Sequence, residues 1–481
     1  MVMAYDMYDV IVIGGGPAGE NAAAYAIAGS DRTAALVERN LVGGECSYWA
    51  CIPSKALLRP GHVLDSARSM PGVREQLSSQ TLDFEAVLSR RDAFVSHHND
   101  SSQIKWANNN GIDIIRGAGR LAGERLVEVG DQVLRARHAV VLATGTTASV
   151  PDVPGLRAAL PWTSRDATNM HELPKRVVIV GGGVVACECA TWLAALGAEE
   201  VIMLVRGKSL LPKAEAFVGE MVAAGLRSNG VEILFSTSPK GVVRPEVRDT
   251  GEGWIHGGPV TVDLGHETLT TDEIVVAAGR APSTHELGLA TVGLTDGGYV
   301  GVDDHMTVLR SGNDWLYAVG DVNGRSPLTH MGKYQARVCG DVIAARSEKR
   351  ALEGSRYCAT ADLQQVPQVI FTAPEVASVG LTESAAASDG FDVTTVELDI
   401  AVAGSSLLRN KYKGHAKLVI NNHTQCLLGA TFVGPEVGEL IHAATIAVVG
   451  EVPLDKLWHA VPAFPTVSEV WLRLLEALRD Q

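Results

Sequence analysis

Two cysteines near the N-terminus have a spacing that suits redox chemistry. Cys46 and Cys51 are separated by four residues, and Ile-Pro-Ser-Lys follows the second cysteine and ends at Lys55. The chain has seven cysteines scattered over 481 residues, an odd number that does not form the framework of a small disulfide-stapled domain. This cysteine usage indicates a reducing cytoplasm, where a close pair of thiols is more often catalytic than structural.

A glycine-rich motif precedes the cysteines and predicts a dinucleotide site. A strand over 8–13 leads into Gly-Gly-Gly-Pro-Ala-Gly at 14–19, and an alanine-rich helix and a strand over 33–37 then end at Glu38. In such a unit the first glycine makes a tight turn, the second admits a pyrophosphate and the third lets helix and strand pack closely. The helix N-terminus attracts the phosphates, and the acid can accept hydrogen bonds from ribose hydroxyls.

The same pattern recurs in the middle of the chain. A strand over 176–180 leads into Gly-Gly-Gly-Val-Val-Ala at 181–186, and a helix and a strand over 201–205 follow. Because each unit cradles one pyrophosphate, two units indicate two nucleotides, naturally a hydride donor and a hydride acceptor. A duplicated domain with one inactive site is the alternative. Beyond the second strand, Arg206 and Lys208 replace the usual acid and suit a ribose 2′-phosphate, which favours NADPH over NADH.

Length and charge narrow the class of protein further. A chain of 481 residues is too long for one core, so two to four domains are expected. The net charge of −14 argues against nucleic acid or an anionic membrane as the main partner. No apolar run reaches the length of a membrane span, and the N-terminus does not read as a secretion signal. We assign no metal site from the sequence.

These motifs, in their order, resemble the flavin-dependent pyridine nucleotide-disulfide oxidoreductases, which include lipoamide dehydrogenase, glutathione reductase and mercuric reductase. Ala-Thr-Gly at 143–145, Gly-Arg-Ala-Pro at 279–282 and Gly-Asp at 320–321 add further landmarks. The resemblance implies an α/β fold with two Rossmann-like doubly wound dinucleotide-binding domains and a C-terminal α+β dimerisation domain. It also implies a homodimer with its active site at the subunit interface. The expected segments are 1–150 and 284–360 for the FAD-binding domain, 151–283 for the NAD(P)H-binding domain and 361–481 for the interface domain.

The resemblance also implies roles for individual residues. Cys51 would lie nearest the flavin and form the charge-transfer thiolate, and Cys46 would exchange with the acceptor, both on a helix start that lowers the thiol pKa. Lys55 would pair with Glu188 beside the flavin N5, where a cation stabilises the reduced flavin. The implied FAD contacts are Gly14, Gly16, Gly19, Glu38, Lys55, Gly119, Thr144, Gly145, Asp321, Leu328 and Thr329. The implied NAD(P)H contacts are Gly181, Gly183, Ala186, Glu188, Arg206, Lys208 and Gly279, and Ala186 in place of a third glycine is similar to NADPH-using glutathione reductases.

One position departs from the family pattern. Pro-Ala-Phe-Pro-Thr-Val-Ser-Glu at 462–469 places Phe464 where the disulfide reductases carry an acid-base histidine oriented by the acid at Glu469. Phenylalanine cannot transfer a proton, so slow turnover of lipoamide or glutathione disulfide is expected. His459 lies five residues before Phe464, and a surface or packing role is expected for it. The chain lacks the C-terminal cysteine pair of mercuric reductases, which argues against mercury as substrate.

Aromatic residues beside the cysteines lead to a specific expectation for the electron acceptor. Tyr48, Trp49 and Phe464 would suit a flat acceptor such as a quinone if they line one pocket; the alternative is that they pack at the subunit interface. The predicted function is therefore NAD(P)H oxidation through FAD and the cysteine pair, with electrons passing to a quinone or another non-standard oxidant. A lipoamide dehydrogenase-like or other disulfide reductase and a non-catalytic flavoprotein redox sensor are the alternatives.

Overall fold

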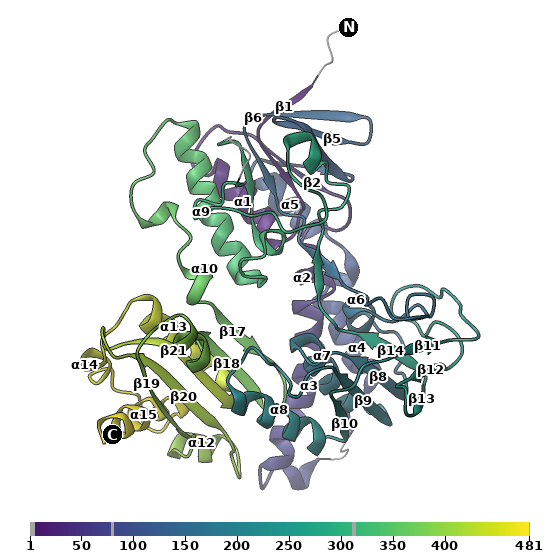
Figure 1. Ribbon diagram of the computed structural model, residues 1–481, viewed down its shortest axis with the longest axis vertical. Coiled ribbons are helices and arrows are strands. Elements are labelled where there is room, and N and C mark those ends of the chain that lie inside the picture. The colour runs from purple at the N-terminus through teal and green to yellow at the C-terminus, as the bar shows by residue number, and fades with distance from the viewer. Residues whose placement is uncertain (1–4, 78–80, 310–313, 481) are drawn as a thin grey trace. The chain divides into compact units, whose positions relative to one another are not determined.

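The computed structural model describes residues 5–77, 81–309 and 314–480 (Figure 1). These residues fall into two compact units, which we describe separately. The first unit draws on the ranges 1–52, 92–147 and 280–363, and the second on 53–91, 148–279 and 364–481. The expected division into four segments is finer than these units and stays a prediction.

A seven-stranded sheet organises the first unit, in the order β3-β2-β1-β6-β5-β4 with β16 also paired to β6. Its central strands are parallel and covered on both faces, which explains their nearly continuous apolar sequences. The strands are β1 Asp6–Ile13, β2 Ala34–Glu38, β3 Ile112–Arg116, β4 Gly119–Gly123, β5 Leu126–Val129, β6 Gln132–Leu142 and β16 Leu316–Ala318.

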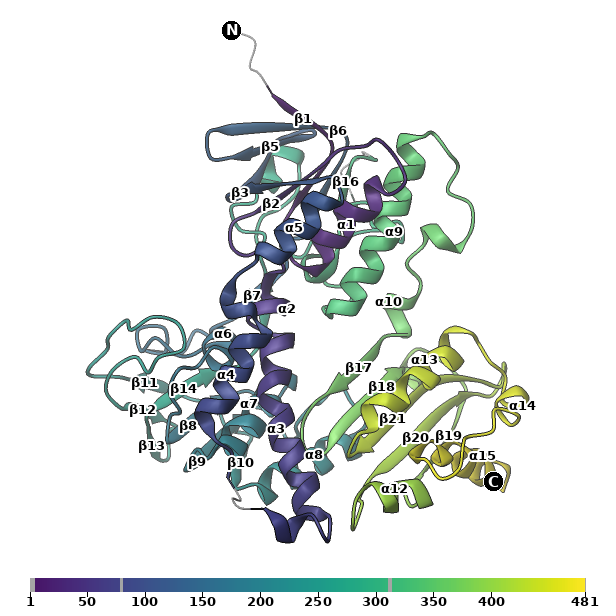
Figure 2. The same cartoon turned by 180° about the vertical axis from the view of Figure 1, so that it is seen from behind.

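Three helices of this unit lie beside one another in both ribbon views (Figures 1 and 2). They are α1 Pro17–Ile27, α5 Ser101–Asn109 and α9 Thr329–Ser347. The backbones of α1 and α9 approach closely, because a Cβ atom at Gly340 would lie 2.4 Å from the Cβ of Tyr25. The short helix α2 Gly44–Tyr48 follows β2.

The second unit contains three sheets. A four-stranded parallel sheet has the order β10-β9-β8-β14, a three-stranded antiparallel sheet has β11-β12-β13, and a five-stranded antiparallel sheet has β17-β18-β21-β20-β19. The strands are β8 Arg176–Val180, β9 Glu200–Val205, β10 Val231–Phe235, β11 Gly241–Val243, β12 Val260–Asp263, β13 Thr268–Thr271, β14 Glu273–Val276, β17 Pro367–Ile370, β18 Glu375–Gly380, β19 Val393–Asp399, β20 His415–Asn421 and β21 Cys426–Gly434.

The remaining elements complete the chain. A two-stranded ladder joins β7 Thr146–Ala148 and β15 Arg280–Pro282. The other α-helices are α3 Cys51–Ser69, α4 Phe84–Phe94, α6 Ser164–Thr168, α7 Val184–Leu196, α8 Ala216–Ser228, α10 Ala361–Gln364, α11 Glu383–Ser388, α12 Ala403–Leu408, α13 Ile441–Val449, α14 Leu454–Leu457 and α15 Val470–Arg479. The 3-10 turns are η1 Arg74–Gln76, η2 Ser96–His98, η3 Leu289–Val292, η4 Gly320–Asn323, η5 Ser355–Tyr357, η6 Val437–Leu440 and η7 Val467–Glu469.

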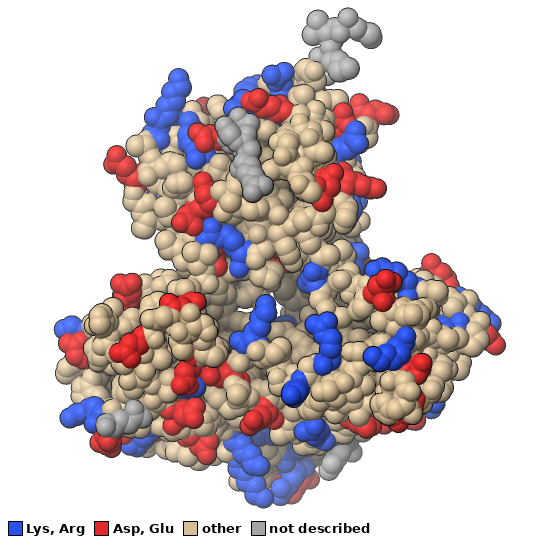
Figure 3. Space-filling model, in the orientation of Figure 1, with Lys and Arg blue, Asp and Glu red and all other residues tan. Residues whose placement is uncertain are grey.

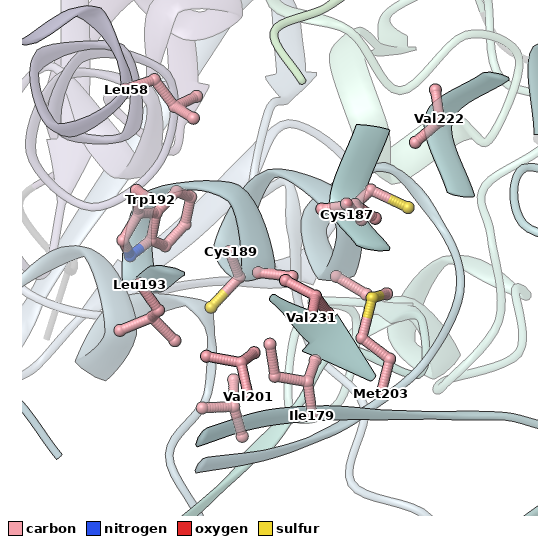
Figure 4. Packing of buried hydrophobic residues seen from close by; sticks show 14 of the residues in the cluster. Leu58, Ile179, Cys187, Cys189, Trp192, Leu193, Val201, Met203, Val222 and Val231 are labelled. Carbon is pink, nitrogen blue, oxygen red and sulfur yellow. The ribbon is translucent and has the colours of Figure 1, made fainter. Parts of the chain in front are cut away.

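The largest core of the second unit is packed between α7 and its parallel sheet. Trp192 and Leu193 of α7 share this core with Val201 and Met203 of β9, and Cys187 and Cys189 fill it as small apolar side chains (Figure 4). Burial raises the pKa of the Cys187 thiol to about 12, so this thiol is inert near neutral pH.

The surface carries mixed charge. Lysine, arginine, aspartate and glutamate side chains are interspersed over the face shown in Figure 3. Within the ranges that the structure describes, no helix is long and apolar enough to cross a membrane.

Candidate active site

The two thiols lie together in the first unit, on either side of a helix break. Helix α2 ends at Tyr48, and α3 begins at Cys51, so the pair does not share one continuous helix. Both cysteines are thiols, and the Cys46 thiol hydrogen-bonds the Cys51 sulfur. The Cys51 Sγ atom lies 3.2 Å from the hydroxyl of Thr329, the first residue of α9. The arrangement is that of a reduced dithiol whose sulfurs can form a disulfide.

The expected lowering of the thiol pKa is wrong for Cys46. Its hydrogen bond to Cys51, followed by burial, raises the pKa of the Cys46 thiol well above its usual range. Thr329 and the positive charge of Lys333 oppose this rise. The hydrogen bond between the two cysteines and the burial of Cys46 thus both favour the protonated form of Cys46.

The expectation that Tyr48 and Trp49 offer a stacking surface is wrong. Both side chains are buried and form a small cluster with Val95. Their rings meet edge to face at 5.7 Å, and the Tyr48 hydroxyl donates a hydrogen bond of 3.1 Å to the carbonyl of Val42. Large aromatic side chains gain more from burial than from exposure, so this pair anchors α2 rather than presenting a flat face.

The first glycine motif has the backbone geometry that the sequence predicts. Gly14 has φ +106°, and a Cβ atom there would lie 2.3 Å from the carbonyl oxygen of Ala143. A Cβ atom at Gly19 would lie 1.8 Å from the Gly14 carbonyl oxygen, whereas the nearest atom to one at Gly16 is 3.9 Å away. Only the middle glycine therefore has open space beside it, as an approaching pyrophosphate would need.

Glu38 holds this turn in place. Its Oε2 atom accepts a hydrogen bond of 2.6 Å from the Gly15 backbone N–H, and its Oε1 atom accepts one of 2.6 Å from Asn40. Hydrogen bonds to a carboxylate are stronger than neutral ones. The acid expected for a ribose thus also locks the end of β2 against the glycine turn.

The segment after β6 brings several expected FAD contacts together. The Thr144 hydroxyl is buried and has no hydrogen-bond partner among the described residues, and Gly145 has φ +69°. The Thr146 hydroxyl donates a hydrogen bond of 2.8 Å to Asp321 of η4. A buried hydroxyl without a partner is costly unless a ligand completes it, so these residues fit a bound flavin nucleotide.

Sequence reasoning missed two residues of this cluster. Arg280 donates to the hydroxyl and the carbonyl of Thr146, both at 2.6 Å, and to Glu45 at 2.9 Å. Glu45 immediately precedes Cys46 on α2. Arg280 therefore connects α2 to the hydrogen-bonded pair of Thr146 and Asp321. The sequence placed Arg280 in a landmark motif, but the pairing with Glu45 spans 235 residues and leaves no local signal.

Three further expected FAD residues have structural roles of their own. A Cβ atom at Gly119 would lie 2.8 Å from Val37 and 3.1 Å from Ile13, so close packing accounts for this glycine. Leu328 caps α9 in an extended conformation, and Thr329 contacts Cys51. Their contact with a flavin stays a prediction.

Lys55 and Glu188 form an ion pair in the second unit. The Lys55 ammonium lies 2.7 Å from Glu188 Oε2, and Glu188 Oε1 accepts a hydrogen bond of 2.9 Å from the Phe371 backbone N–H. Glu188 is 4% exposed, and the Lys55 ammonium also lies 4.9 Å from the centre of the Phe371 ring. Lys55 follows Cys51 by four residues on α3. The structure brings this expected pair together.

The second glycine motif repeats the first turn. A Cβ atom at Gly181 would lie 2.3 Å from the Ala277 carbonyl oxygen, whereas Gly183 and Gly279 have nothing within 4 Å. Ala186 is buried at the third position. Arg206 and Lys208 follow β9 and are exposed, and their contact with a nucleotide ribose stays a prediction.

The C-terminal residues lie on the surface of the second unit. Phe464 is 75% exposed, and His459 is also exposed. Glu469 is nearly buried, and its Oε1 atom accepts a hydrogen bond of 3.0 Å from Arg473. Within one chain, therefore, neither Phe464 nor His459 is oriented by the glutamate.

Comparison with known proteins agrees with this geometry. The family model of the pyridine nucleotide-disulphide oxidoreductases matches residues 8–336, and the dimerisation-domain model of that family matches 366–474. A mercuric reductase from Staphylococcus aureus is 29% identical over 465 residues, 96% of this chain and 81% of that protein. A dihydrolipoyl dehydrogenase from Bacillus subtilis (strain 168) is 29% identical over 478 residues, 97% of this chain and 96% of that protein.

A solved structure shares the fold over nearly the whole chain. The Cu(II) complex of the HOCl-induced flavoprotein disulfide reductase RclA from Escherichia coli matches with a TM-score of 0.81 and 25% sequence identity. The match covers 98% of this chain and 99% of that one. With both family models matched in order and the thiol pair, glycine turns and Lys55–Glu188 pair in place, this chain belongs to the pyridine nucleotide-disulphide oxidoreductases, a family of enzymes that use FAD and NAD(P)H.

Proposed function

We propose that this enzyme oxidises NADPH, or less readily NADH, and passes the electrons through FAD and Cys46–Cys51 to a small acceptor that is not an ordinary disulfide. A quinone is the first candidate. The observation that carries the proposal is the hydrogen-bonded thiol pair beside Thr329, combined with phenylalanine at the family's acid-base position. The thiol pair can accept and pass on electrons. The histidine that would transfer protons in disulfide exchange is replaced by an apolar side chain.

Residues of the first unit would hold the FAD. Gly16 leaves room for the pyrophosphate, Thr144 offers a hydroxyl without a partner among the described residues, and Asp321, which accepts a hydrogen bond from Thr146, would contact the ribityl chain. When bound, FAD takes a hydride from the nicotinamide and passes on its electrons in pairs.

The protein's own groups set the charge and the protons of the reaction. Cys46 retains its proton, and Cys51 is the sulfur that accepts its hydrogen bond. The buried Glu188 side chain accepts a hydrogen bond of 2.7 Å from the Lys55 ammonium and would hold that ammonium beside the flavin N5. In the second unit, Arg206 would contact a 2′-phosphate, which supports NADPH.

A homodimer in a reducing cytoplasm is part of the proposal. The C-terminal residues match the family's dimerisation domain, and Val461 and Phe464 are 81% and 75% exposed there. Exposed apolar side chains in an interface domain favour burial against a second copy. Phe464 would then reach the partner's site as an apolar group.

A soft metal ion is the second candidate acceptor. The two adjacent thiols favour it, because thiolates are the preferred ligands of soft ions. The Cu(II) complex of RclA supports this class. The relatives named mercuric reductase support it as well, although the missing C-terminal cysteine pair argues against mercury as the ion for this chain. Electron transfer from a thiolate to a metal ion also needs no proton donor, so phenylalanine at position 464 would not hinder it.

Anaerobic reduction followed by acceptor challenge tests the proposal. We expect NADPH to reduce the flavin and a long-wavelength thiolate-to-flavin band to appear, which Cys51→Ser removes. The reduced enzyme should then turn over 1,4-naphthoquinone or Cu(II) much faster than lipoamide or glutathione disulfide. Phe464→His is the matched variant, and it should raise disulfide turnover. Rapid disulfide turnover by the unaltered enzyme would overturn the proposal, and absence of flavin reduction would leave only a sensor role.

A further inference from the structure

A cavity of about 420 Å³ opens in the first unit beside α1, α5 and α9. Both ribbon views show these three helices next to one another (Figures 1 and 2). The cavity offers an ammonium, a carboxyl, a hydroxyl, two amides and an indole. Its lining residues are Glu20, Asn21, Ser102, Gln103, Trp106 and Lys333.

Helix α9 connects this cavity to the thiols. Its first residue, Thr329, lies 3.2 Å from the Cys51 sulfur, and Lys333 follows one helical turn later. Residues four apart lie on the same face of a helix. The positive charge of Lys333 acts on both Cys46 and Glu20, so the cavity and the redox pair share one electrostatic environment.

Glu20 is a half-buried acid whose carboxyl the fold leaves incompletely paired. Its Oε1 atom is buried and has no hydrogen-bond partner among the described residues, and the same holds for the Gln103 Oε1 atom in this cavity. Burial raises the pKa of Glu20 to about 7, Lys333 opposes this rise and the negative charge of Glu38 adds to it. Tyr48 also faces Glu20, and burial raises the pKa of that phenol to about 12, so it stays neutral.

We propose that Glu20 donates a proton to a carbonyl acceptor reduced in this cavity, a role separate from the thiol acid-base that is missing at position 464. This inference rests on the proposed function, since it requires electrons to leave through Cys46–Cys51. A carboxyl serves best as a general acid when its pKa lies near the working pH, and Glu20 meets that condition.

The reaction with a quinone balances with these groups. The S–H bond of Cys46 and the O–H bond of Glu20 break, and a sulfur–sulfur bond forms between Cys46 and Cys51. The two electrons released by the sulfurs reduce the quinone, and the two protons form its two O–H bonds. The negative charge that begins on the Cys51 thiolate ends on the Glu20 carboxylate, which solvent then reprotonates.

The lining of the cavity matches a flat carbonyl acceptor. Trp106 is 40% exposed and offers an aromatic face, and Ser102 and Lys333 offer hydrogen-bond donors for the carbonyl oxygens. A quinone needs both, and it also needs the proton that Glu20 holds.

Glu20→Gln tests the assignment, with Glu85→Gln on the exposed start of α4 as the matched control. Stopped-flow experiments would follow flavin reduction by NADPH and then reoxidation by 1,4-naphthoquinone. We expect Glu20→Gln to slow reoxidation roughly 100-fold while FAD content and flavin reduction stay unchanged. In the unaltered enzyme and in Glu85→Gln, reoxidation should decline as pH rises through about 7, and Glu20→Gln should lack this decline.

Lys333→Met provides a second, independent readout. Because the lysine lowers the pKa of Glu20, its removal should move the decline to higher pH. An unchanged rate and pH profile in Glu20→Gln would overturn the Glu20 assignment alone. Failure of the unaltered enzyme to reduce the quinone, despite normal flavin reduction, would instead overturn the quinone proposal, and the Glu20 assignment with it.

Discussion

The two strand–helix–strand motifs of this chain form the same glycine turn but differ in the residues that follow it. In both, the first glycine faces a carbonyl oxygen so closely that a Cβ atom would lie 2.3 Å from it. The third position differs, because Gly19 has no room for a side chain whereas Ala186 is accommodated in a buried site. The shared turn therefore sets the phosphate cradle, and the packing of each helix on its strand decides which small residue is allowed.

The strand ends and the helices differ as well. Glu38 at the end of β2 accepts two backbone hydrogen bonds, whereas β9 ends before the exposed Arg206. Helix α1 carries Glu20 with an unpaired oxygen, whereas α7 carries Glu188 paired with Lys55. One scaffold thus carries a carboxyl oxygen without a hydrogen-bond partner among the described residues on its first helix, and a carboxylate in an ion pair on its second.

Among the substitutions considered, Gly19→Ala should have the largest effect, because it disrupts the glycine turn of the first strand–helix–strand motif. The new Cβ atom would lie 1.8 Å from the Gly14 carbonyl oxygen, and overpacking of this kind costs about 3 kcal/mol. We expect loss of bound FAD and a lower thermal unfolding temperature. Ala186→Gly in the second unit is the matched change, and it should cost only about 1 kcal/mol and leave FAD content intact. Equal effects of the two variants would contradict the packing difference.

The pH dependence of the free energy of unfolding should show the raised pKa of Glu20 on α1. Because the pKa of folded Glu20 lies above its unfolded value of 4.5, its contribution to stability is full below pH 4.5 and is lost as pH rises through about 7. Between pH 5 and 9 this loss is about 2 kcal/mol, allowing for partial solvent access. Chemical denaturation of Glu20→Gln should show a correspondingly smaller decline than the unaltered protein, and Glu85→Gln should not.

Glu38→Ala should weaken the first unit by removing the lock on its glycine turn. The Gly15 and Asn40 N–H groups would lose their carboxylate acceptor, at a cost of about 1–2 kcal/mol. Urea denaturation and FAD absorbance would measure the effect. A variant that keeps full stability and FAD content would show that Glu38 serves neither purpose.

Arg206→Ala should change only coenzyme choice. Loss of a charge-assisted contact to the 2′-phosphate is expected to raise the KM for NADPH roughly tenfold and to leave that for NADH unchanged. Stability should stay within about 0.5 kcal/mol, since Arg206 is exposed. Lys240→Ala, another exposed cation of the second unit, is the control. Parallel changes for both coenzymes would contradict a role in phosphate recognition.

Local sequence patterns predicted the strands and turns well. The strand expected over 176–180 is β8, and those expected over 8–13 and 201–205 lie within β1 and β9. Apolar runs of this length between glycine turns have few alternatives, because parallel strands are buried on both faces. The ion pair of Lys55 and Glu188 was also predicted, although only through the family resemblance.

The errors concern residues whose behaviour depends on distant neighbours. Tyr48 and Trp49 were expected to offer a stacking surface, but Val95, from another part of the chain, completes a cluster that buries them. The Cys46 thiol was expected to have a lowered pKa, but its hydrogen bond to Cys51 and its burial reverse the direction. Glu20 was missed, although an acid among the alanines that follow the glycine motif is a signal that could have found it.

The sequence by itself determined the family, the two nucleotide turns and the redox thiols, because each depends on residues close together in the chain. Only the tertiary structure decided which side chains have shifted pKa values. The pKa of a side chain depends on burial and on charges brought near it from other elements, as α9 brings Lys333 to Glu20 and Cys46. Burial raises the pKa of Glu20 to about 7 against the opposing charge of Lys333, in a residue that the sequence left unremarked.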